Sequence, residues 1–372
     1  MPIGRSIGIL GLGTLLASAG ADELTQQVDR LAQPYVEHGV VVGMTVGFLA
    51  EGQERVRSYG RLSTTDDRAP DGRTVYEIGS VTKPITGILL GVAVARGEVR
   101  EGQPAAELLP PGVRMPSCGG KPITLEHLAT HTSGLPRLPD NFQPEEASNP
   151  YACYTETRLD AFLNEHALRR PPGERAEYSN LGAGLLGHLL ARRADRDFQQ
   201  LVAERIAQPL GMTDTAVSLS PEMRERLAPP HRADGSPDTG WDLAILAGAG
   251  GLRSTVQDML RLLAAHLDPP DGVLGQAIER AWTIQPDPGE PPDFSMGWGW
   301  FVARDGQTRW HNGQTGGYRS MALVGREPPI AVVVLANTAT AEVDRLAEDI
   351  FRLLAGHPVE PRTFESRPAK GP

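Results

Sequence analysis

Apolar and polar residues follow two different periods along this chain, and the period changes twice. Near the start, residues 22–38 carry apolar side chains every three or four positions, which predicts an amphipathic helix. Residues 40–50 are β-branched and apolar and predict a buried strand. A turn at Glu51-Gly52 joins this strand to a second one at 53–60, so a β-hairpin is predicted.

The strand pattern returns near the other end of the chain. The strands predicted there are 297–304, 308–311, 318–326 and 330–337. A closing helix is predicted from about Glu342 to Ala355, with Gly356 ending it. The segment between the two strand regions is mainly helical, with predicted helices at 80–95, 125–131, 160–168, 181–194 and 198–206. Ser254 is predicted to cap a further helix that carries Asp258 in its first turn.

This order predicts an α+β fold. One antiparallel sheet, flanked by helices and built from both termini, would carry an inserted, mainly helical domain. The predicted parts are a sheet lobe of residues 22–78 and 281–356, a helical lobe of residues 79–280 and a flexible tail from 357 to 372. A site in the cleft between the two lobes is expected, because ligand sites favour such boundaries.

Residues 1–21 resemble a secretory signal, with Arg5 before an apolar stretch and Ala19-Gly20-Ala21 as a cleavage site. The apolar stretch is too short to span a bilayer. We therefore expect an exported protein, periplasmic or secreted, without a membrane span. The net charge of −10 and the absence of a basic cluster exclude nucleic acid as an expected partner. The oligomeric state is left open.

The chain has two cysteines, Cys118 and Cys153. In an exported protein such a pair is a candidate disulfide, and two free thiols are the alternative. Neither cysteine has a histidine or a second thiol at the spacing of zinc ligands. We expect no metal and no cofactor.

Ser80 and Lys83 form an S-x-x-K pattern at the start of an apolar helix. Three residues in a helix make one turn, so the hydroxyl and the amine would share a face. Burial lowers the pKa of a lysine, which lets Lys83 accept a proton from the nucleophile Ser80. The dipole at the start of the helix would favour a developing oxyanion.

Tyr178 and Asn180 lie where a loop enters the next predicted helix. An ammonium on Lys83 would lower the pKa of the Tyr178 phenol. The two groups would then share protons, and which of them is the base for acylation stays open. Asn180 offers an amide for hydrogen bonds to Lys83 and to a substrate.

The third pattern, residues 311–317 (HNGQTGG), ends one predicted strand and precedes the next. Its glycines, Gly313 among them, let a substrate backbone approach closely. The backbone N–H of Gln314 is expected to face that of Ser80 and complete an oxyanion hole.

The three patterns follow one another along the chain in the order given above. In this respect the chain resembles the serine hydrolases related to class C β-lactamases. That superfamily also includes D-Ala-D-Ala carboxypeptidases and β-lactamase-like esterases. Further matching stretches are 131–136 (HTSGLP), 250–255 (GGLRST) and 335–337 (LAN). The resemblance implies an acyl-enzyme on Ser80 and water activated by Tyr178. It also implies that Asn180 positions the substrate amide and that His311 lines the pocket near a substrate carboxylate.

His311 stands where class C β-lactamases have a lysine. A histidine at its ordinary pKa is mostly neutral at pH 7, so the charge that holds a substrate carboxylate is missing. The resemblance therefore leaves several substrates open. We expect a β-lactamase-like hydrolase of a β-lactam or a related amide or ester. A D-Ala-D-Ala carboxypeptidase acting on peptidoglycan peptides and a short-chain carboxylesterase are the alternatives. A catalytically silent scaffold with the same fold is the non-enzymatic one.

Overall fold

The computed structural model describes residues 12–285 and 295–364. Its strands are β1 (Gly43–Ala50), β2 (Gln53–Gly60), β3 (Tyr76–Glu77), β4 (Arg253–Ser254), β5 (Ser295–Met296), β6 (Phe301–Val302), β7 (Thr308–Gln314), β8 (Arg319–Arg326) and β9 (Pro329–Ala336). Its α-helices are α1 (Leu12–Glu37), α2 (Thr82–Ala95), α3 (Leu125–Ala129), α4 (Glu156–Glu165), α5 (Asn180–Arg193), α6 (Phe198–Val202), α7 (Pro221–Glu225), α8 (Val256–Leu267), α9 (Val273–Trp282) and α10 (Glu342–Leu354). Shorter helical turns are η1 (Gly79–Val81), η2 (Ala105–Leu108), η3 (Ala203–Ala207) and η4 (Ala244–Ala249).

Seven strands form the main sheet in the order β2-β1-β9-β8-β7-β6-β5, and every neighbouring pair is antiparallel. The interior strand β9 is a run of β-branched and apolar residues, almost all of them buried, as expected for a strand covered on both faces. β1 pairs with β9 through partners such as Val46 and Val334. The two ends of the chain therefore build one sheet, and the predicted α+β fold is confirmed.

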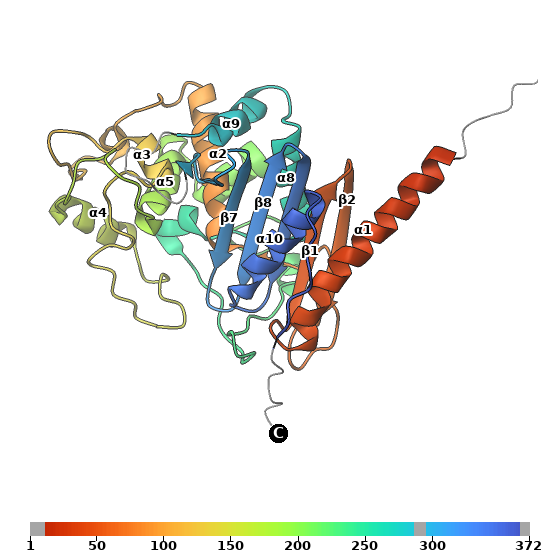
Figure 1. Ribbon diagram of the computed structural model, residues 1–372. Helices are drawn as coiled ribbons and strands as arrows, with labels where there is room; N and C mark the ends of the chain where they lie inside the picture. The colour runs from red at the N-terminus through yellow and green to blue at the C-terminus, as the bar shows by residue number, and fades with distance from the viewer. Residues whose placement is uncertain (1–11, 286–294, 365–372) are drawn as a thin grey trace, which may run out of the picture.

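Helices cover both faces of this sheet (Figure 1). α1 and α10 pack on one face and enclose one apolar core with residues of β1, β8 and β9. α8 packs on the other face, next to the helices of the segment 79–280, and a second, larger core lies there. α2 is apolar nearly all round and is buried within this second core.

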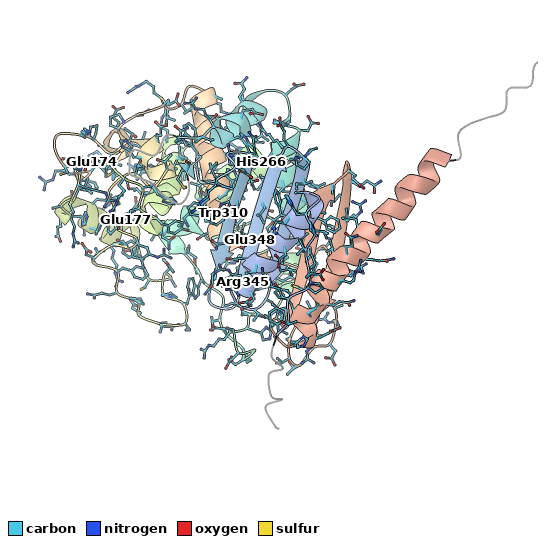
Figure 2. The ribbon with its side chains drawn as sticks, viewed as in Figure 1. Glu174, Glu177, His266, Trp310, Arg345 and Glu348 are labelled. Carbon is cyan, nitrogen blue, oxygen red and sulfur yellow. The ribbon has the colours of Figure 1, made fainter. Side chains whose placement is uncertain are left out.

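Side chains of β7 alternate between the two faces of the sheet. Asn312 donates a hydrogen bond from Nδ2 to Asp344 of α10 at 2.7 Å, so the even-numbered positions face that helix. Trp310 on β7 and Glu348 on α10 line a pocket of about 480 Å³ on this side (Figure 2). His311 faces the opposite side, with its ring centroid 6.2 Å from that of Tyr178. The alternation thus directs His311 toward the second core.

Most predicted elements occur close to the predicted positions, but two details are wrong. The strand predicted at 297–304 is only the short β6, because Trp298 and Gly299 lie in the turn between β5 and β6. The residue that caps α8 is Thr255, whose hydroxyl accepts a hydrogen bond from the Asp258 N–H at 3.2 Å. Ser254 belongs to β4 and pairs with Tyr76, so it cannot act as the cap.

Both ends of the chain are described only in part. The first half of the predicted signal, residues 1–11, lies outside the described residues, and residues 12–21 are the first part of α1. Within the predicted flexible tail, residues 357–364 pack against the fold. Arg362 pairs with Asp349 of α10 at 2.6 Å, and the Phe364 ring meets Tyr35 of α1 at 4.8 Å. Residues 365–372 lie outside the described part. In that part, no helix has the length and apolarity needed to cross a bilayer.

Both cysteines are free thiols in the structure, so the candidate disulfide is not formed. Cys118 lies in a tight turn that closes on Lys121. The Cys153 sulfur lies 3.5 Å from Nη1 of Arg158 and 3.7 Å from the Gln143 carbonyl oxygen. Each thiol lies in a different loop. The sequence alone gave no information on the distance between these two loops in the fold.

Candidate active site

Ser80 lies in the short turn η1, immediately before α2. Two glycines let this turn lie directly against β7. Gly79 has φ +48°, and a Cβ there would come within 2.8 Å of the Gln314 nitrogen. A Cβ on Gly313 would come within 2.9 Å of the Ser80 nitrogen. The backbones that carry the Ser80 and Gln314 N–H groups are therefore neighbours, as the sequence predicted.

Lys83 is fully buried in the first turn of α2. Its Nζ lies 2.8 Å from Ser80 Oγ and donates a hydrogen bond to the Ala249 carbonyl oxygen of η4 at 2.6 Å. Burial lowers the pKa of this amine well below its usual value of 10.5, and the nearby Arg137 guanidinium lowers it further. Both effects favour the neutral form of the amine beside the Ser80 hydroxyl.

The Tyr178 phenol donates a hydrogen bond to Ser80 Oγ at 2.8 Å. Lys83 Nζ also lies 4.8 Å from the centroid of the Tyr178 ring, so the three groups form one cluster. Burial raises the pKa of Tyr178 to about 12. The expected decrease is wrong, because desolvation of a buried phenolate outweighs the Ser80 hydrogen bond and the Arg137 charge, which both lower the pKa. The phenol keeps its proton at neutral pH.

Asn180 begins α5, one residue after Ser179, whose hydroxyl caps the helix by accepting from the Gly182 N–H at 2.8 Å. Asn180 Nδ2 donates to the Tyr151 hydroxyl at 3.2 Å. Its Oδ1 is buried and has no hydrogen-bond partner in the structure. The expected contact with Lys83 is therefore replaced by one with Tyr151, and an unpaired acceptor is left in the site.

His311 is fully buried, and its Nδ1 donates to the Asn312 carbonyl oxygen at 2.6 Å. This contact places the proton on Nδ1 and leaves a lone pair on Nε2, which has no partner in the structure. Burial holds the pKa of His311 well below 6.5. The imidazole is neutral because of burial, not because of its ordinary pKa. The Gln314 side chain points away and accepts from Arg319 Nη1 at 2.7 Å.

The sequence patterns did not identify Arg137, Tyr151 or the Ala249 carbonyl as parts of this site. Arg137 directly follows the HTSGLP stretch, so its position in the sequence was the available signal. Tyr151 and Ala249 carry no motif, because one lies in an irregular loop and the other contributes only a backbone oxygen. Side-chain spacing along the chain cannot reveal such contacts.

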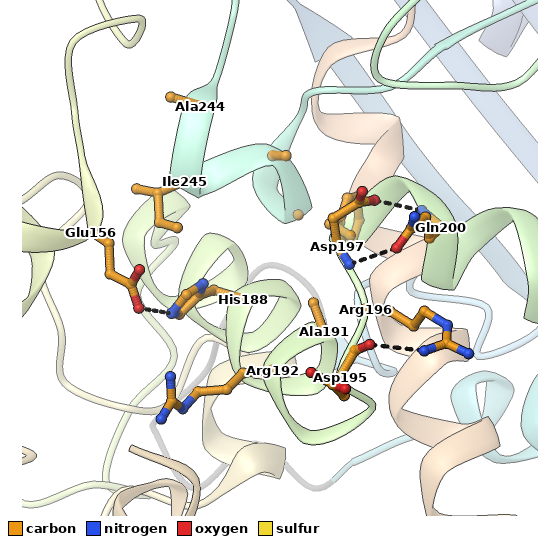
Figure 3. Close-up of a pocket in the computed structure, with 13 residues that line it drawn as sticks. Glu156, His188, Ala191, Arg192, Asp195, Arg196, Asp197, Gln200, Ala244 and Ile245 are labelled. Carbon is orange, nitrogen blue, oxygen red and sulfur yellow. Dashed lines mark hydrogen bonds and ion pairs between the residues drawn. The ribbon is translucent and has the colours of Figure 1, made fainter. Parts of the chain in front are cut away.

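The turn η4 also forms part of a separate pocket of about 750 Å³ between η4, α5 and the start of α6 (Figure 3). At its edge His188 Nε2 lies 3.4 Å from Glu156 Oε1, and Asp197 and Gln200 hydrogen-bond to each other's backbone N–H. This pocket is lined by none of the Ser80, Lys83 and Tyr178 cluster.

A hydroxyl held between a buried amine and a phenol, beneath the edge of an antiparallel sheet, defines an acyl-transferring serine hydrolase. Comparison with known proteins agrees. Residues 28–357 match the family described as Beta-lactamase, and the chain belongs to this family.

The relatives are similar over most of their length. The chain is 31% identical to the D-alanyl-D-alanine-carboxypeptidase/endopeptidase AmpH of Escherichia coli K12, over 88% of both chains. It is 29% identical to a beta-lactamase of the same organism, over 76% of this chain and 71% of the relative. A crystal structure of a beta-lactamase/D-alanine carboxypeptidase from Yersinia pestis, complexed with citrate, matches with a TM-score of 0.76 and 25% identity, over 90% of this chain and 98% of the other. The predicted family and the enzymatic reading are confirmed, so the chain is a serine hydrolase and not a silent scaffold.

Proposed function

We propose that this protein cleaves the terminal peptide bond of D-alanyl-D-alanine peptides through an acyl-enzyme on Ser80. The observation that carries the proposal is the contact of Ser80 Oγ with both Lys83 Nζ and the Tyr178 hydroxyl at 2.8 Å. Of the two sequence relatives described above, the one with the wider coverage is a D-alanyl-D-alanine-carboxypeptidase/endopeptidase. A β-lactam ring would acylate the same serine, since it presents the same reacting carbonyl to the site.

In the acylation step, the neutral amine of Lys83 accepts the Ser80 proton while Oγ attacks the carbonyl carbon. The carbonyl π electrons move to the oxygen, which the N–H groups of Ser80 and Gln314 stabilise. When the bond to the leaving amine breaks, the Tyr178 phenol gives that amine a proton and regains one from Lys83. This assigns the base to Lys83, because Tyr178 has a pKa of about 12 and is protonated at neutral pH.

In the second step, water takes the place of the leaving amine. Its proton passes through Tyr178 to Lys83 as the oxygen attacks the acyl carbon, and Ser80 Oγ leaves and recovers its proton. Asn180 holds the substrate amide through its unpaired Oδ1, which accepts from an N–H of the acyl part. His311 and Gly313 line the strand edge beside the substrate.

A β-lactamase is the second candidate, and a relative of 29% identity carries that name. The neutral, buried His311 does not separate the two candidates, because a β-lactam and a D-Ala-D-Ala peptide both carry a carboxylate to which this side chain offers no charge. A short-chain esterase remains the third possibility of the sequence. We further propose export, on the signal-like pattern of residues 1–21; a product that stays in the cytoplasm with these residues attached would contradict it.

Intact mass after incubation with benzylpenicillin tests the nucleophile. The wild type should gain one penicilloyl group, and Ser80→Ala should gain none while keeping its circular dichroism spectrum. Ser133→Ala is the matched control, since it removes another buried hydroxyl from the neighbouring HTSGLP turn. An adduct or peptide cleavage retained by Ser80→Ala would overturn the assignment.

The substrate is tested on a panel of acetyl-D-Ala-D-Ala, a chromogenic cephalosporin and a butyrate ester. A stable penicilloyl adduct with release of D-alanine supports the carboxypeptidase. Rapid loss of the adduct with fast cephalosporin turnover supports the β-lactamase. Turnover of the ester alone supports the esterase.

A further inference from the structure

The third motif of this site supplies no positive charge. His311 is neutral and fully buried, and its free nitrogen can only accept a hydrogen bond. Lys83 is engaged with Ser80 and the Ala249 carbonyl oxygen, and burial favours its neutral form. A negatively charged group on a substrate therefore has to pair with a cation elsewhere in the site.

Arg137 is held beside the catalytic cluster by its own backbone. Its carbonyl oxygen accepts from the Leu181 N–H at 3.1 Å, and the carbonyl oxygen of the preceding Pro136 accepts from the Ser179 hydroxyl at 2.6 Å. Both partners belong to the start of α5, directly after Tyr178. The loop that carries Arg137 is thus fixed to the segment that positions the phenol.

The Arg137 side chain is exposed, and its guanidinium carbon lies 5.0 Å from the centroid of the Tyr178 ring. Such stacking on an aromatic face orients the guanidinium plane and leaves its N–H groups available. Within residues 12–285 and 295–364, no carboxylate forms an ion pair with Arg137. Glu177, the acid next to Tyr178 in the sequence, is engaged by Arg170 at 2.6 Å and by Arg175 at 3.5 Å (Figure 2).

The position of Arg137 indicates which part of a substrate it would meet. Its guanidinium carbon lies 5.0 Å from the centroid of the Tyr178 ring, and its carbonyl oxygen accepts from the N–H of Leu181, the residue after Asn180. Tyr151 is the hydrogen-bond partner of Asn180, which holds the amide of the acyl part in the proposed function. Arg137 therefore lies on the acyl side of Ser80, away from the strand edge at His311.

We propose that Arg137 binds a carboxylate on the acyl part of the substrate, so that the preferred acyl donors are acidic. The proposal rests on the proposed function for the identity of the acyl side. The guanidinium offers two parallel N–H groups to a carboxylate, a geometry that a lysine cannot reproduce. Arg137 is in this sense a residue that determines specificity rather than one that handles protons.

Two nitrophenyl esters of equal acyl length provide the test. Mono-4-nitrophenyl adipate carries a free carboxylate at the far end of its acyl chain, and 4-nitrophenyl hexanoate does not. Arg137→Gln should lower kcat/KM for the adipate about 10- to 100-fold, the range for one charge-assisted pair. It should change the hexanoate value by less than about threefold. Arg137→Lys should recover part of the lost kcat/KM for the adipate, because it restores the positive charge but not the two parallel N–H groups of the guanidinium.

Other outcomes would overturn the proposal. An equal loss on both esters would mean that Arg137 acts through Lys83 and Tyr178, and no loss on either would exclude a contact. A loss on acetyl-D-Ala-D-Ala that disappears for its C-terminal amide, with the adipate unaffected, would place the carboxylate on the leaving group instead.

A binding measurement separates this proposal from the proposed function. Adipamic acid has the same carboxylate and an amide at the reacting carbon, and hexanamide lacks the carboxylate. Ligand-observed NMR should show preferential binding of adipamic acid to the wild type and loss of this preference in Arg137→Gln. If no ester or peptide is hydrolysed at all, the proposed function fails, and this preference still decides the role of Arg137. Equal binding of the two amides to the wild type would refute that role.

Discussion

Replacing Lys83 by methionine tests whether the buried amine is neutral in the folded protein. An amine whose folded pKa is depressed lowers stability wherever the unfolded chain is protonated and the folded chain is not. For Lys83 this window runs from the depressed folded pKa up to the ordinary value of 10.5. Inside the window the unfolded state binds one more proton, so the stability of the wild type rises with pH by about 1.4 kcal/mol per unit. Lys83→Met lacks this proton and should lack the slope.

The difference in free energy of unfolding between the wild type and Lys83→Met should thus change by about 3 kcal/mol between pH 7.5 and 9.5, in favour of the wild type at high pH. The variant leaves the Ala249 carbonyl oxygen without its donor, at a cost of about 1–3 kcal/mol, and this cost does not depend on pH. The slope, not the offset, is therefore the decisive quantity.

Urea unfolding followed by tryptophan fluorescence measures this slope at several pH values. Lys121→Met is the matched control, because it makes the same replacement at an exposed position. It should give a difference from the wild type that is flat from pH 7.5 to 9.5. A flat difference for Lys83→Met as well would show that Lys83 is charged in the folded protein, and the assignment of the base would then be wrong. Activity should fall at least about 10²-fold in Lys83→Met, as expected on loss of a general base.

Three further predictions concern proton transfer, capping and the thiols. Tyr178→Phe should keep the acylation burst with a nitrophenyl ester, whose leaving group needs no proton, but slow deacylation by about 10²–10⁴-fold; stopped-flow traces in which both phases slow equally would contradict the relay. Thr255→Ala should lower the free energy of unfolding by about 1 kcal/mol through loss of the cap on Asp258 N–H, with Ser254→Ala compared to detect an unexpected role of the neighbour; an unchanged urea midpoint for Thr255→Ala would count against the cap. Alkylation of the denatured, unreduced protein should label both Cys118 and Cys153 by mass spectrometry, whereas protection of both until reduction would indicate a disulfide.

The sequence predicted the fold and the core of the site because both depend on local patterns. The hairpin of β1 and β2 occurs where its two strands and the Glu51-Gly52 turn were expected, since period-two alternation and turn residues act over a few positions. Two details failed: β6 is shortened by the turn that separates it from β5, and the cap of α8 depends on which residue pairs with a distant strand. Ser254 illustrates this, because its pairing with Tyr76 across the chain excludes it from the cap.

The amino-acid sequence by itself indicated the family and a candidate nucleophile with its candidate partners, because a serine, a lysine one helical turn later and two further motifs can be read directly from it. Only the tertiary structure decided the protonation states and the surrounding contacts. Burial of Lys83 and Tyr178 moves their pKa values apart, so that the amine is free to accept a proton and the phenol retains one. Solvation and charge at a site depend on which distant segments close over it, and segments such as the loop of Arg137 meet the phenol only after the chain has folded.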